Sequence, residues 1–108
     1  MRIYGIKTCD TCRKALKALE NAGHKPEFVD VRATPLSPEK RLAFLDAFGP
    51  EALMNRRSTT WKGLSETERA ADPEALLTSH PTLMKRPVIE TDQELHLGWT
   101  VAVQAAVL

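Results

Sequence analysis

The segment MRIYGIKTCDTCRKALKALENAGHKPEFVDV, residues 1–31, decides the fold. Residues 1–6 form a short apolar run typical of a strand, and residues 27–31 alternate between polar and apolar side chains as a second strand does. Between them, apolar residues recur at helical spacing as far as Gly23, a natural helix end; they are Ala15, Leu16, Ala18, Leu19 and Ala22. Because a helix joins the two strands through a short connection, we predict a βαβ unit with parallel strands.

Cys9 and Cys12 form a Cys-x-x-Cys pair at the junction between the first strand and this helix. A helix start leaves backbone N–H groups unpaired and carries about half a positive charge, and both stabilise a thiolate over a thiol. The thiolate is the reactive form of cysteine, and its pKa can fall from about 8.5 to between about 3.5 and 7.5 in such a position. The pair is therefore a candidate redox centre.

Two other interpretations of the cysteine pair stay open. A zinc site needs more ligands than these two cysteines, and the nearest histidine, His24, lies beyond a full helix length, so we expect no metal site. Two buried, unreactive cysteines are the second alternative. Against it, Cys9 lies in the polar stretch 7–11 at the junction of two elements and not in an apolar stripe.

Length and charge bound the class of protein. The 108 residues fit one compact domain, which is large enough to bury a core without disulfides. With 15 Lys and Arg against 14 Asp and Glu, the formal net charge of +1 gives no general attraction to nucleic acid or to an anionic membrane. The sequence shows neither the apolar core of a signal peptide nor an apolar run of about 18 residues, so we expect a cytoplasmic protein. In that reducing compartment a cysteine pair is more often catalytic or sensing than structural.

The middle of the chain carries helix-start signals. Ser37-Pro38 combines a capping hydroxyl with a proline in the first turn, and apolar residues then continue to Gly49; they are Leu42, Phe44, Leu45 and Phe48. Residues 65–68, Ser-Glu-Thr-Glu, match a capping box, and Asp72-Pro73 begins another short helix. We therefore predict a helical insertion at roughly residues 37–86.

The last part of the chain is predicted to form a hairpin and a helix. Residues 88–90 and 94–98 have strand character around a polar turn, and residues 99–108 have the pattern of a helix packed by Val101, Val103 and Val107. The summed order is β-α-β, helices, β-β-α. This order predicts an α/β, thioredoxin-like fold with an inserted helical lobe, in a single domain over residues 1–108.

Three segments match a known family: residues 4–15 (YGIKTCDTCRKA), 53–61 (LMNRRSTTW) and 80–88 (HPTLMKRPV). Through them the chain resembles the arsenate reductase (ArsC) family, which includes YffB-type proteins and Spx-type transcription regulators. The Asn-Arg-Arg-x-Thr-Thr-Trp string is most similar to the YffB-type branch. The resemblance runs nearly end to end and implies a thioredoxin-like core with an inserted helical lobe.

The resemblance also implies roles for individual residues. Cys9 matches the family's nucleophile, and Cys12 matches the second cysteine that Spx-type members use as a redox switch. Arg86 matches one of the arginines with which arsenate reductases hold the oxyanion. A second arginine of that set falls on Arg56 or Arg57, and the sequence leaves the choice between them open.

Two further features belong to the candidate site. Thioredoxin-like folds place a cis-proline opposite the cysteine pair, and Pro87 after Arg86 is expected to take this place; a trans proline that begins a strand is the alternative. Arg13 lies four residues after Cys9, where its charge would lower the thiol pKa while Asp10 opposes it. A solvated helix face is the other interpretation of Arg13.

These observations predict a cytoplasmic thiol reductase without a bound cofactor. Cys9 would attack a disulfide or small oxyanion substrate and Cys12 would resolve the adduct. The ArsC resemblance implies that glutathione or a glutaredoxin takes part. Arsenate is less favoured as a substrate, because residues 97–99 are Leu-Gly-Trp and supply no third oxyanion arginine. The alternative function is a Spx-like regulator, in which the same cysteine pair alters binding to RNA polymerase and nothing is turned over.

Overall fold

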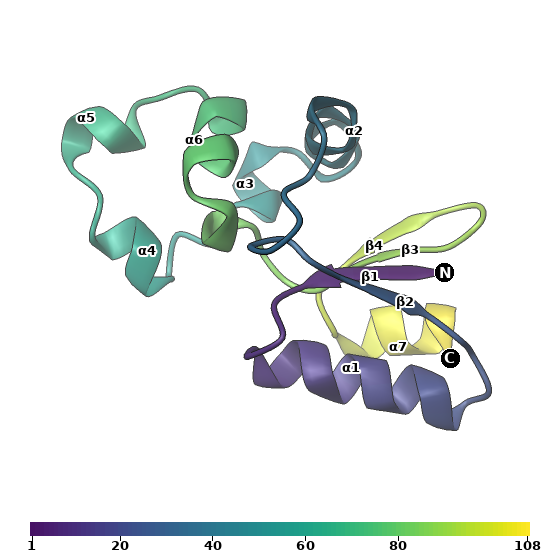
Figure 1. Ribbon diagram of the computed structural model, residues 1–108. Coiled ribbons are helices and arrows are strands. Elements are labelled where there is room, and N and C mark those ends of the chain that lie inside the picture. The colour runs from purple at the N-terminus through teal and green to yellow at the C-terminus, as the bar shows by residue number, and fades with distance from the viewer. The chain divides into compact units, whose positions relative to one another are not determined.

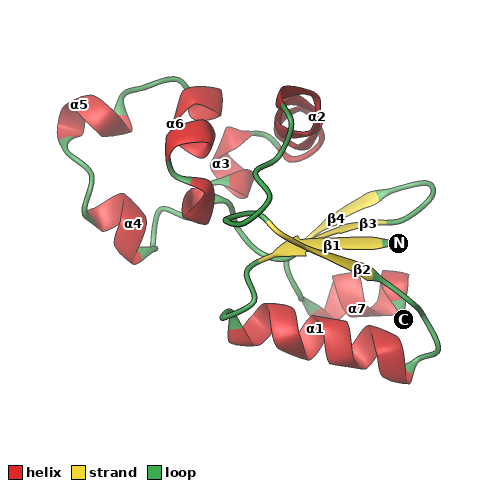
Figure 2. Ribbon diagram, viewed as in Figure 1, coloured by secondary structure: helices red, strands yellow, loops and turns green.

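The computed structural model describes residues 1–108, and the chain divides into two compact units. We call Met1–Thr34 with Arg86–Leu108 the sheet unit, and Pro35–Lys85 the helical unit. Along the chain the elements run β-α-β, then five helices and a 3₁₀ turn, then β-β-α (Figure 1 and Figure 2). This is the thioredoxin-like α/β order that the sequence predicted.

The sheet unit is a four-stranded mixed sheet with two helices. Its elements are β1 (Arg2–Gly5), α1 (Asp10–Asn21), β2 (Glu27–Asp30), β3 (Val88–Glu90), β4 (Leu95–Leu97) and α7 (Val101–Val107). The strand order is β2-β1-β3-β4. β1 and β2 are parallel, as the βαβ pattern predicted, whereas β3 is antiparallel to both β1 and β4.

The core of the sheet unit lies between the sheet and its two helices. α1 and α7 both lie on one face of the sheet in Figure 1. Ile3 and Ile89 from the two central strands pack with Leu19 of α1 and Val107 of α7, and all four are at most 5% exposed. α1 ends before Gly23, whose φ of +94° is in the left-handed region that glycine adopts without strain. The hydrophobic spacing of residues 15–22 therefore sets where α1 packs.

The helical unit consists of short helices with conventional caps. Its elements are α2 (Pro38–Phe48), α3 (Pro50–Leu53), α4 (Thr59–Lys62), α5 (Glu66–Arg69), α6 (Pro73–Ser79) and the 3₁₀ turn η1 (Pro81–Leu83). Ser37 and Asp72 cap α2 and α6, and the predicted capping box of Ser65 and Glu68 is present at α5. The sequence did not predict α3, α4 or η1, because one helical turn is too short to show a hydrophobic period.

Two predicted packing residues are instead exposed. Leu42 of α2 is 53% exposed and Val101 of α7 is 83% exposed. Each lies two positions before a residue that does pack, Phe44 in α2 and Val103 in α7. Two positions correspond to about 200° of rotation around a helix, so both side chains point away from the packed face. The sequence prediction relied on the number of apolar residues and did not consider their angular positions around the helix.

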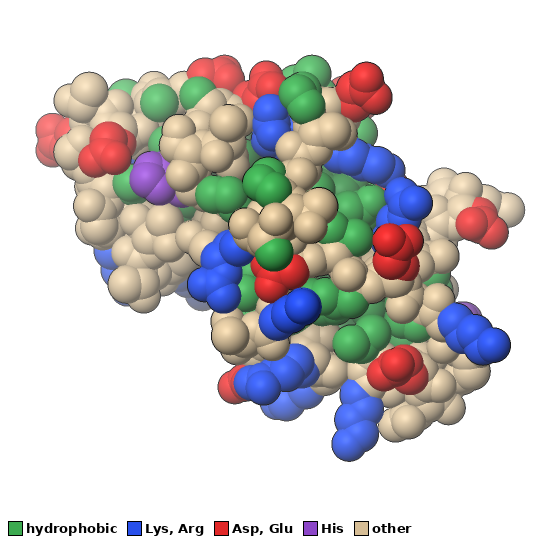
Figure 3. Space-filling view, in the orientation of Figure 1, with side chains coloured by type: hydrophobic (Ala, Val, Ile, Leu, Met, Phe, Trp, Pro, Cys, Tyr) green, Lys and Arg blue, Asp and Glu red, His purple; other side chains and the backbone are tan.

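No helix combines the length and the apolar character that a transmembrane span requires. Figure 3 shows Lys and Arg side chains among Asp and Glu side chains over the face in view, consistent with the formal net charge of +1.

Candidate redox site

Cys9 is the N-cap residue of α1. Its backbone is extended (φ −82°, ψ 119°), its N–H donates to the Ile6 carbonyl at 3.0 Å, and its carbonyl accepts from the Arg13 N–H at 3.0 Å. The end of β1 thus turns directly into the first turn of the helix. The thiol is partly exposed, so a substrate can reach it from solvent.

Cys12 lies one turn further along α1 and is completely buried. Both cysteines are free thiols. A Cβ atom added to Gly5 would lie 2.5 Å from Cys12 Sγ and 3.2 Å from Cys12 Cβ. Since real Cβ atoms do not approach sulfur so closely, the missing side chain at the end of β1 provides the space in which Cys12 packs.

The surroundings move the two thiol pKa values in opposite directions. Burial acts to raise the pKa of Cys9, but hydrogen bonds from the Cys12 N–H, the Cys12 thiol and Arg86 outweigh it and hold this pKa below its ordinary value. Burial, followed by the neighbouring Cys9, raises the pKa of Cys12 to about 11 although the Ile6 backbone opposes the shift. The pair therefore combines a thiolate-forming, accessible sulfur with a protonated, buried one.

Arg86 lies beside the Cys9 sulfur in the sheet unit, and Pro87 follows it in the chain. The Arg86-Pro87 peptide bond is cis, which is the geometry that the resemblance implied, and Pro87 is fully buried. The carbonyl of Pro87 accepts from the Gly98 N–H at 2.8 Å, so the loop is joined to the end of β4. In this position Arg86 is the cation that stabilises the Cys9 thiolate, through a hydrogen bond and through its charge.

Arg13 has a different partner from the one we expected. Its guanidinium forms an ion pair with Asp10 one turn earlier on α1, and both side chains are exposed. Arg13 is not among the groups that lower the Cys9 pKa. The structure therefore favours the solvated helix face over a direct role at the sulfur.

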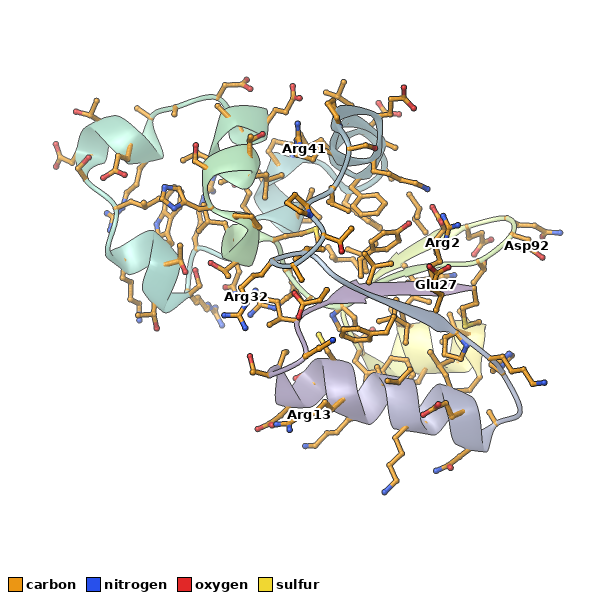
Figure 4. All side chains as sticks on the ribbon, viewed as in Figure 1. Arg2, Arg13, Glu27, Arg32, Arg41 and Asp92 are labelled. Carbon is orange, nitrogen blue, oxygen red and sulfur yellow. The ribbon has the colours of Figure 1, made fainter.

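The loop before Cys9 is held by two residues that the sequence analysis missed. The Asp30 carboxylate accepts from the Lys7 N–H at 3.0 Å and from the N–H groups of Arg32 and Ala33 at 2.9 and 3.3 Å. These backbone hydrogen bonds, that of Lys7 first, keep the pKa of Asp30 below its usual value. Arg32 Nη2 donates to Thr8 Oγ1 at 3.2 Å, and Figure 4 shows Arg32 near the end of α1 that carries Arg13.

A sequence signal for these two residues did exist. In a parallel βαβ unit the carboxyl ends of both strands meet at one edge of the sheet. Asp30 ends β2 and Arg32 follows it, at the same edge where Lys7 and Thr8 follow β1. Polar residues at and just beyond both strand ends were therefore candidates for contact.

Arg56 and Arg57 belong to the helical unit and differ in their partners. Arg56 forms an ion pair with Glu51, and its guanidinium lies 5.5 Å from the ring centroid of Trp61. Arg57 makes a backbone hydrogen bond to the Asn55 side chain, while its guanidinium has no ion pair or hydrogen bond within the chain. Both line a shallow pocket of about 390 Å³ with Asn55 and Lys85. Of the two, Arg57 is the arginine available to an anion.

Residues 4–105 match the ArsC family. The chain belongs to that family. The match covers almost the whole sheet unit and all of the helical unit, and it includes both cysteines, Arg86 and Pro87. The family relationship that the three sequence segments implied is thus confirmed.

Three known proteins are similar to this chain over most of its length, two of them in structure and one in sequence. The solved structure of the YFFB protein has a TM-score of 0.91 and 30% sequence identity, covering 99% of this chain and 97% of its own. An arsenate reductase (ArsC) related protein from Brucella melitensis has a TM-score of 0.77 and 38% identity, covering 97% of this chain and 91% of its own. The global transcriptional regulator Spx of Bacillus subtilis is 29% identical, covering 90% of this chain and 78% of that protein. The similarity to YFFB agrees with the YffB-type branch that the sequence indicated.

At the end of β4, where the ArsC resemblance implies a third oxyanion arginine, this chain has Leu97, Gly98 and Trp99. Gly98 has a φ of +82°, and the next residue, Trp99, packs against the core of the sheet unit. An arginine side chain is strained at the first position and would lose apolar packing at the second. Elsewhere, no group of three or more His, Cys, Asp or Glu is placed to hold a metal ion.

Proposed function

We propose that this protein is a glutathione-linked thiol–disulfide oxidoreductase. The observation that carries the proposal is the pair of opposite pKa shifts: Cys9 below its ordinary value beside Arg86, and Cys12 raised to about 11 in a buried position. A nucleophile must be a thiolate at working pH, whereas the resolving thiol must stay protonated until it attacks. The two sulfurs meet these requirements in that order.

The proposed reaction runs on a glutathione mixed disulfide, RS–SG. The Cys9 thiolate attacks the glutathione sulfur, the RS–S bond breaks, and RS⁻ leaves and takes a proton from solvent. Cys12 then loses its proton and attacks the Cys9 sulfur, which releases glutathione as a thiolate and leaves a Cys9–Cys12 disulfide. Two further glutathione thiols reduce that disulfide and leave as oxidised glutathione, so that the net reaction is RSSG + GSH → RSH + GSSG.

Two arginines are proposed to hold the anionic groups of the substrate. Arg86 lies against the Cys9 sulfur, and Arg57 has a guanidinium without a partner in the chain. Between Arg56 and Arg57, we favour Arg57 for this role, because Arg56 already contacts Glu51 and Trp61. Arsenate reduction, suggested by the Brucella melitensis relative, is expected to be weak because a third arginine is missing after β4.

Trapping the intermediate tests this proposal. The protein is incubated with a glutathionylated peptide as wild type, Cys12→Ser and Cys9→Ser, and is then analysed by intact mass and peptide mapping. We expect Cys12→Ser to accumulate a glutathione adduct on Cys9, and Cys9→Ser to show neither adduct nor turnover. An adduct on Cys12, or full turnover without Cys9, would mean that the roles are reversed.

A regulatory function is the second candidate. Its support is the similarity to the Spx regulator over 90% of this chain, together with the Cys-x-x-Cys pair. In this case the Cys9–Cys12 disulfide would change the binding of RNA polymerase, with no turnover. Pull-down of purified polymerase with the oxidised and the reduced protein separates the two functions. A regulator should bind the polymerase differently in its two redox states, whereas the proposed enzyme does not require polymerase binding in either state.

A further inference from the structure

We infer that Arg32 forms a carboxylate-binding subsite beside Cys9, which holds a carboxylate of glutathione during thiol exchange. The inference rests on the proposed function for its ligand. Nothing in the ArsC resemblance pointed to Arg32, which the structure brings to the redox end of the sheet unit from the segment after β2.

The first support is position. Arg32 Nη2 donates to Thr8 Oγ1 at 3.2 Å, and Thr8 directly precedes the nucleophile Cys9. The Arg32 side chain is exposed, and the Cys9 thiol is partly exposed. The guanidinium therefore contacts the side chain of Thr8, the residue next to the one to which a molecule on the Cys9 sulfur would be bonded.

The second support is charge. Arg13, the other exposed arginine at this end, is neutralised by Asp10. The Asp30 carboxylate, two residues before Arg32, accepts three backbone N–H groups and interacts with the Arg32 guanidinium through charge, without a salt bridge or side-chain hydrogen bond to it. Figure 4 shows Arg32 and Arg13 at this end of the unit and Asp92 on the distant hairpin turn. The positive charge of Arg32 is thus available to a ligand.

The third support is the chemistry of the ligand. Guanidinium carries five N–H donors in a planar fork that matches a carboxylate, and Thr8 uses only one of them. Glutathione has two carboxylates, one on the glycine and one on the γ-glutamyl residue, and these residues flank the cysteine that carries its sulfur. A glutathione moiety on Cys9 can therefore place one carboxylate on Arg32 while its sulfur stays on Cys9.

The experiment compares four proteins: wild type, Arg32→Ala, Thr8→Val and Lys17→Ala. Lys17 is an exposed cation in the middle of α1, so its substitution removes the same charge away from the loop. Thr8→Val breaks the hydrogen bond to Arg32 and keeps the guanidinium. Each protein is assayed with a glutathionylated peptide and with bis(2-hydroxyethyl) disulfide, which has no carboxylate, and is titrated with S-methylglutathione, which binds but cannot react.

We expect Arg32→Ala to lower kcat/KM for the glutathionylated peptide by about five-fold, the scale of one exposed carboxylate–arginine pair, with little change for the uncharged disulfide. S-methylglutathione should bind more weakly by a similar factor, and this loss should shrink at high salt. Lys17→Ala should change neither value. Equal losses on both disulfides, or a Thr8→Val effect as large as that of Arg32→Ala, would show that Arg32 only supports the loop and would overturn the subsite.

The same experiment distinguishes a failure of the proposed function from a failure of the Arg32 subsite. A wild-type protein that turns over neither disulfide would reject the oxidoreductase, but the titration would still report on the subsite. Weaker S-methylglutathione binding to Arg32→Ala than to Lys17→Ala would then support it, and equal binding would overturn it.

Discussion

The two units use their arginines in different ways. In the sheet unit, Arg86 lies against the Cys9 sulfur and Arg32 against the loop that carries it. In the helical unit, Arg56 is held by Glu51 and Trp61, and Arg69 donates to the carbonyls of residues 61 and 62. Arginine side chains therefore stabilise the reactive thiolate and its loop in one unit, and they hold short helices together in the other. Proximity to the cysteine motif in sequence does not tell the two uses apart, since Arg13 is near Cys9 but pairs with Asp10.

The largest expected effect is a difference in reactivity between the two sulfurs of the sheet unit. The pKa of Cys9 lies below the ordinary 9.0, and that of Cys12 is about 11. A separation of at least about two pH units corresponds to roughly a hundred-fold difference in thiolate fraction at neutral pH. We expect iodoacetamide to alkylate Cys12→Ser at least that much faster than Cys9→Ser, as measured by mass over a pH series. Equal rates would remove the basis of the proposed roles.

The same pKa shift predicts a pH dependence of stability. The folded state keeps the Cys12 proton to a pH of about 11, whereas the ordinary thiol loses it near 9.0. Stability from this group is therefore complete below the unfolded pKa and falls as the pH rises towards the folded one. Urea unfolding of the Cys12→Ala variant should show a smaller loss of stability between these pH values than the wild type does. Parallel curves for the two proteins would count against the buried, protonated thiol.

The next largest effect is a loss of stability, which we expect when a side chain is added beside Cys12. We expect Gly5→Ala to destabilise the protein by about 2 to 3 kcal/mol, at the upper end of the usual cost of overpacking, because its Cβ would lie 2.5 Å from Cys12 Sγ. Chemical denaturation measures this loss. Gly23→Ala tests whether the cause is crowding, since no atom lies within 4 Å of its Cβ position and only backbone strain is added.

A double-mutant cycle separates the sulfur from other neighbours of Gly5. Removing the sulfur with Cys12→Ala should recover most of the Gly5→Ala loss, although the Cys12 Cβ at 3.2 Å remains close. If the two losses simply add, the space at Gly5 has no special relation to Cys12.

The sequence predicted the elements of the fold better than the contacts of the site. The βαβ unit, the hairpin and the capped starts of α2, α5 and α6 were predicted correctly, because each depends on neighbours within a few residues. The space that Gly5 leaves for Cys12 was not predicted, because it depends on how the end of β1 packs against α1, and the hydrogen bond of Asp30 to Lys7 was not, because it joins residues that are 23 positions apart. The choice between Arg56 and Arg57 depended on the position of Glu51, which lies one short helix earlier.

Arg86 should give the next effect in size. Its hydrogen bond and charge both favour the Cys9 thiolate, and burial of the sulfur opposes them. We expect Arg86→Ala to raise the Cys9 pKa and to lower the alkylation rate at neutral pH about ten-fold, the scale of one hydrogen bond to a charged group. Arg86→Lys, which keeps the charge but loses the planar fork, should recover part of the rate. An unchanged pH profile in Arg86→Ala would show that Cys12 and the helix start alone activate the thiol.

The smallest effects are expected in the helical unit, where Arg56 and Arg57 form a matched pair. Arg56→Ala removes an exposed ion pair to Glu51 and a stacking contact with Trp61, so it should cost about 1 kcal/mol of stability. Arg57→Ala removes a guanidinium with no partner in the chain and should leave the unfolding midpoint in place. If Arg57 binds substrate anions as proposed, its loss raises the KM for a glutathionylated peptide about two- to five-fold, whereas loss of Arg56 acts through stability. The reverse pattern, a KM effect from Arg56→Ala and none from Arg57→Ala, would mean that Glu51 releases Arg56 to the substrate and that the contrast between the two units does not hold.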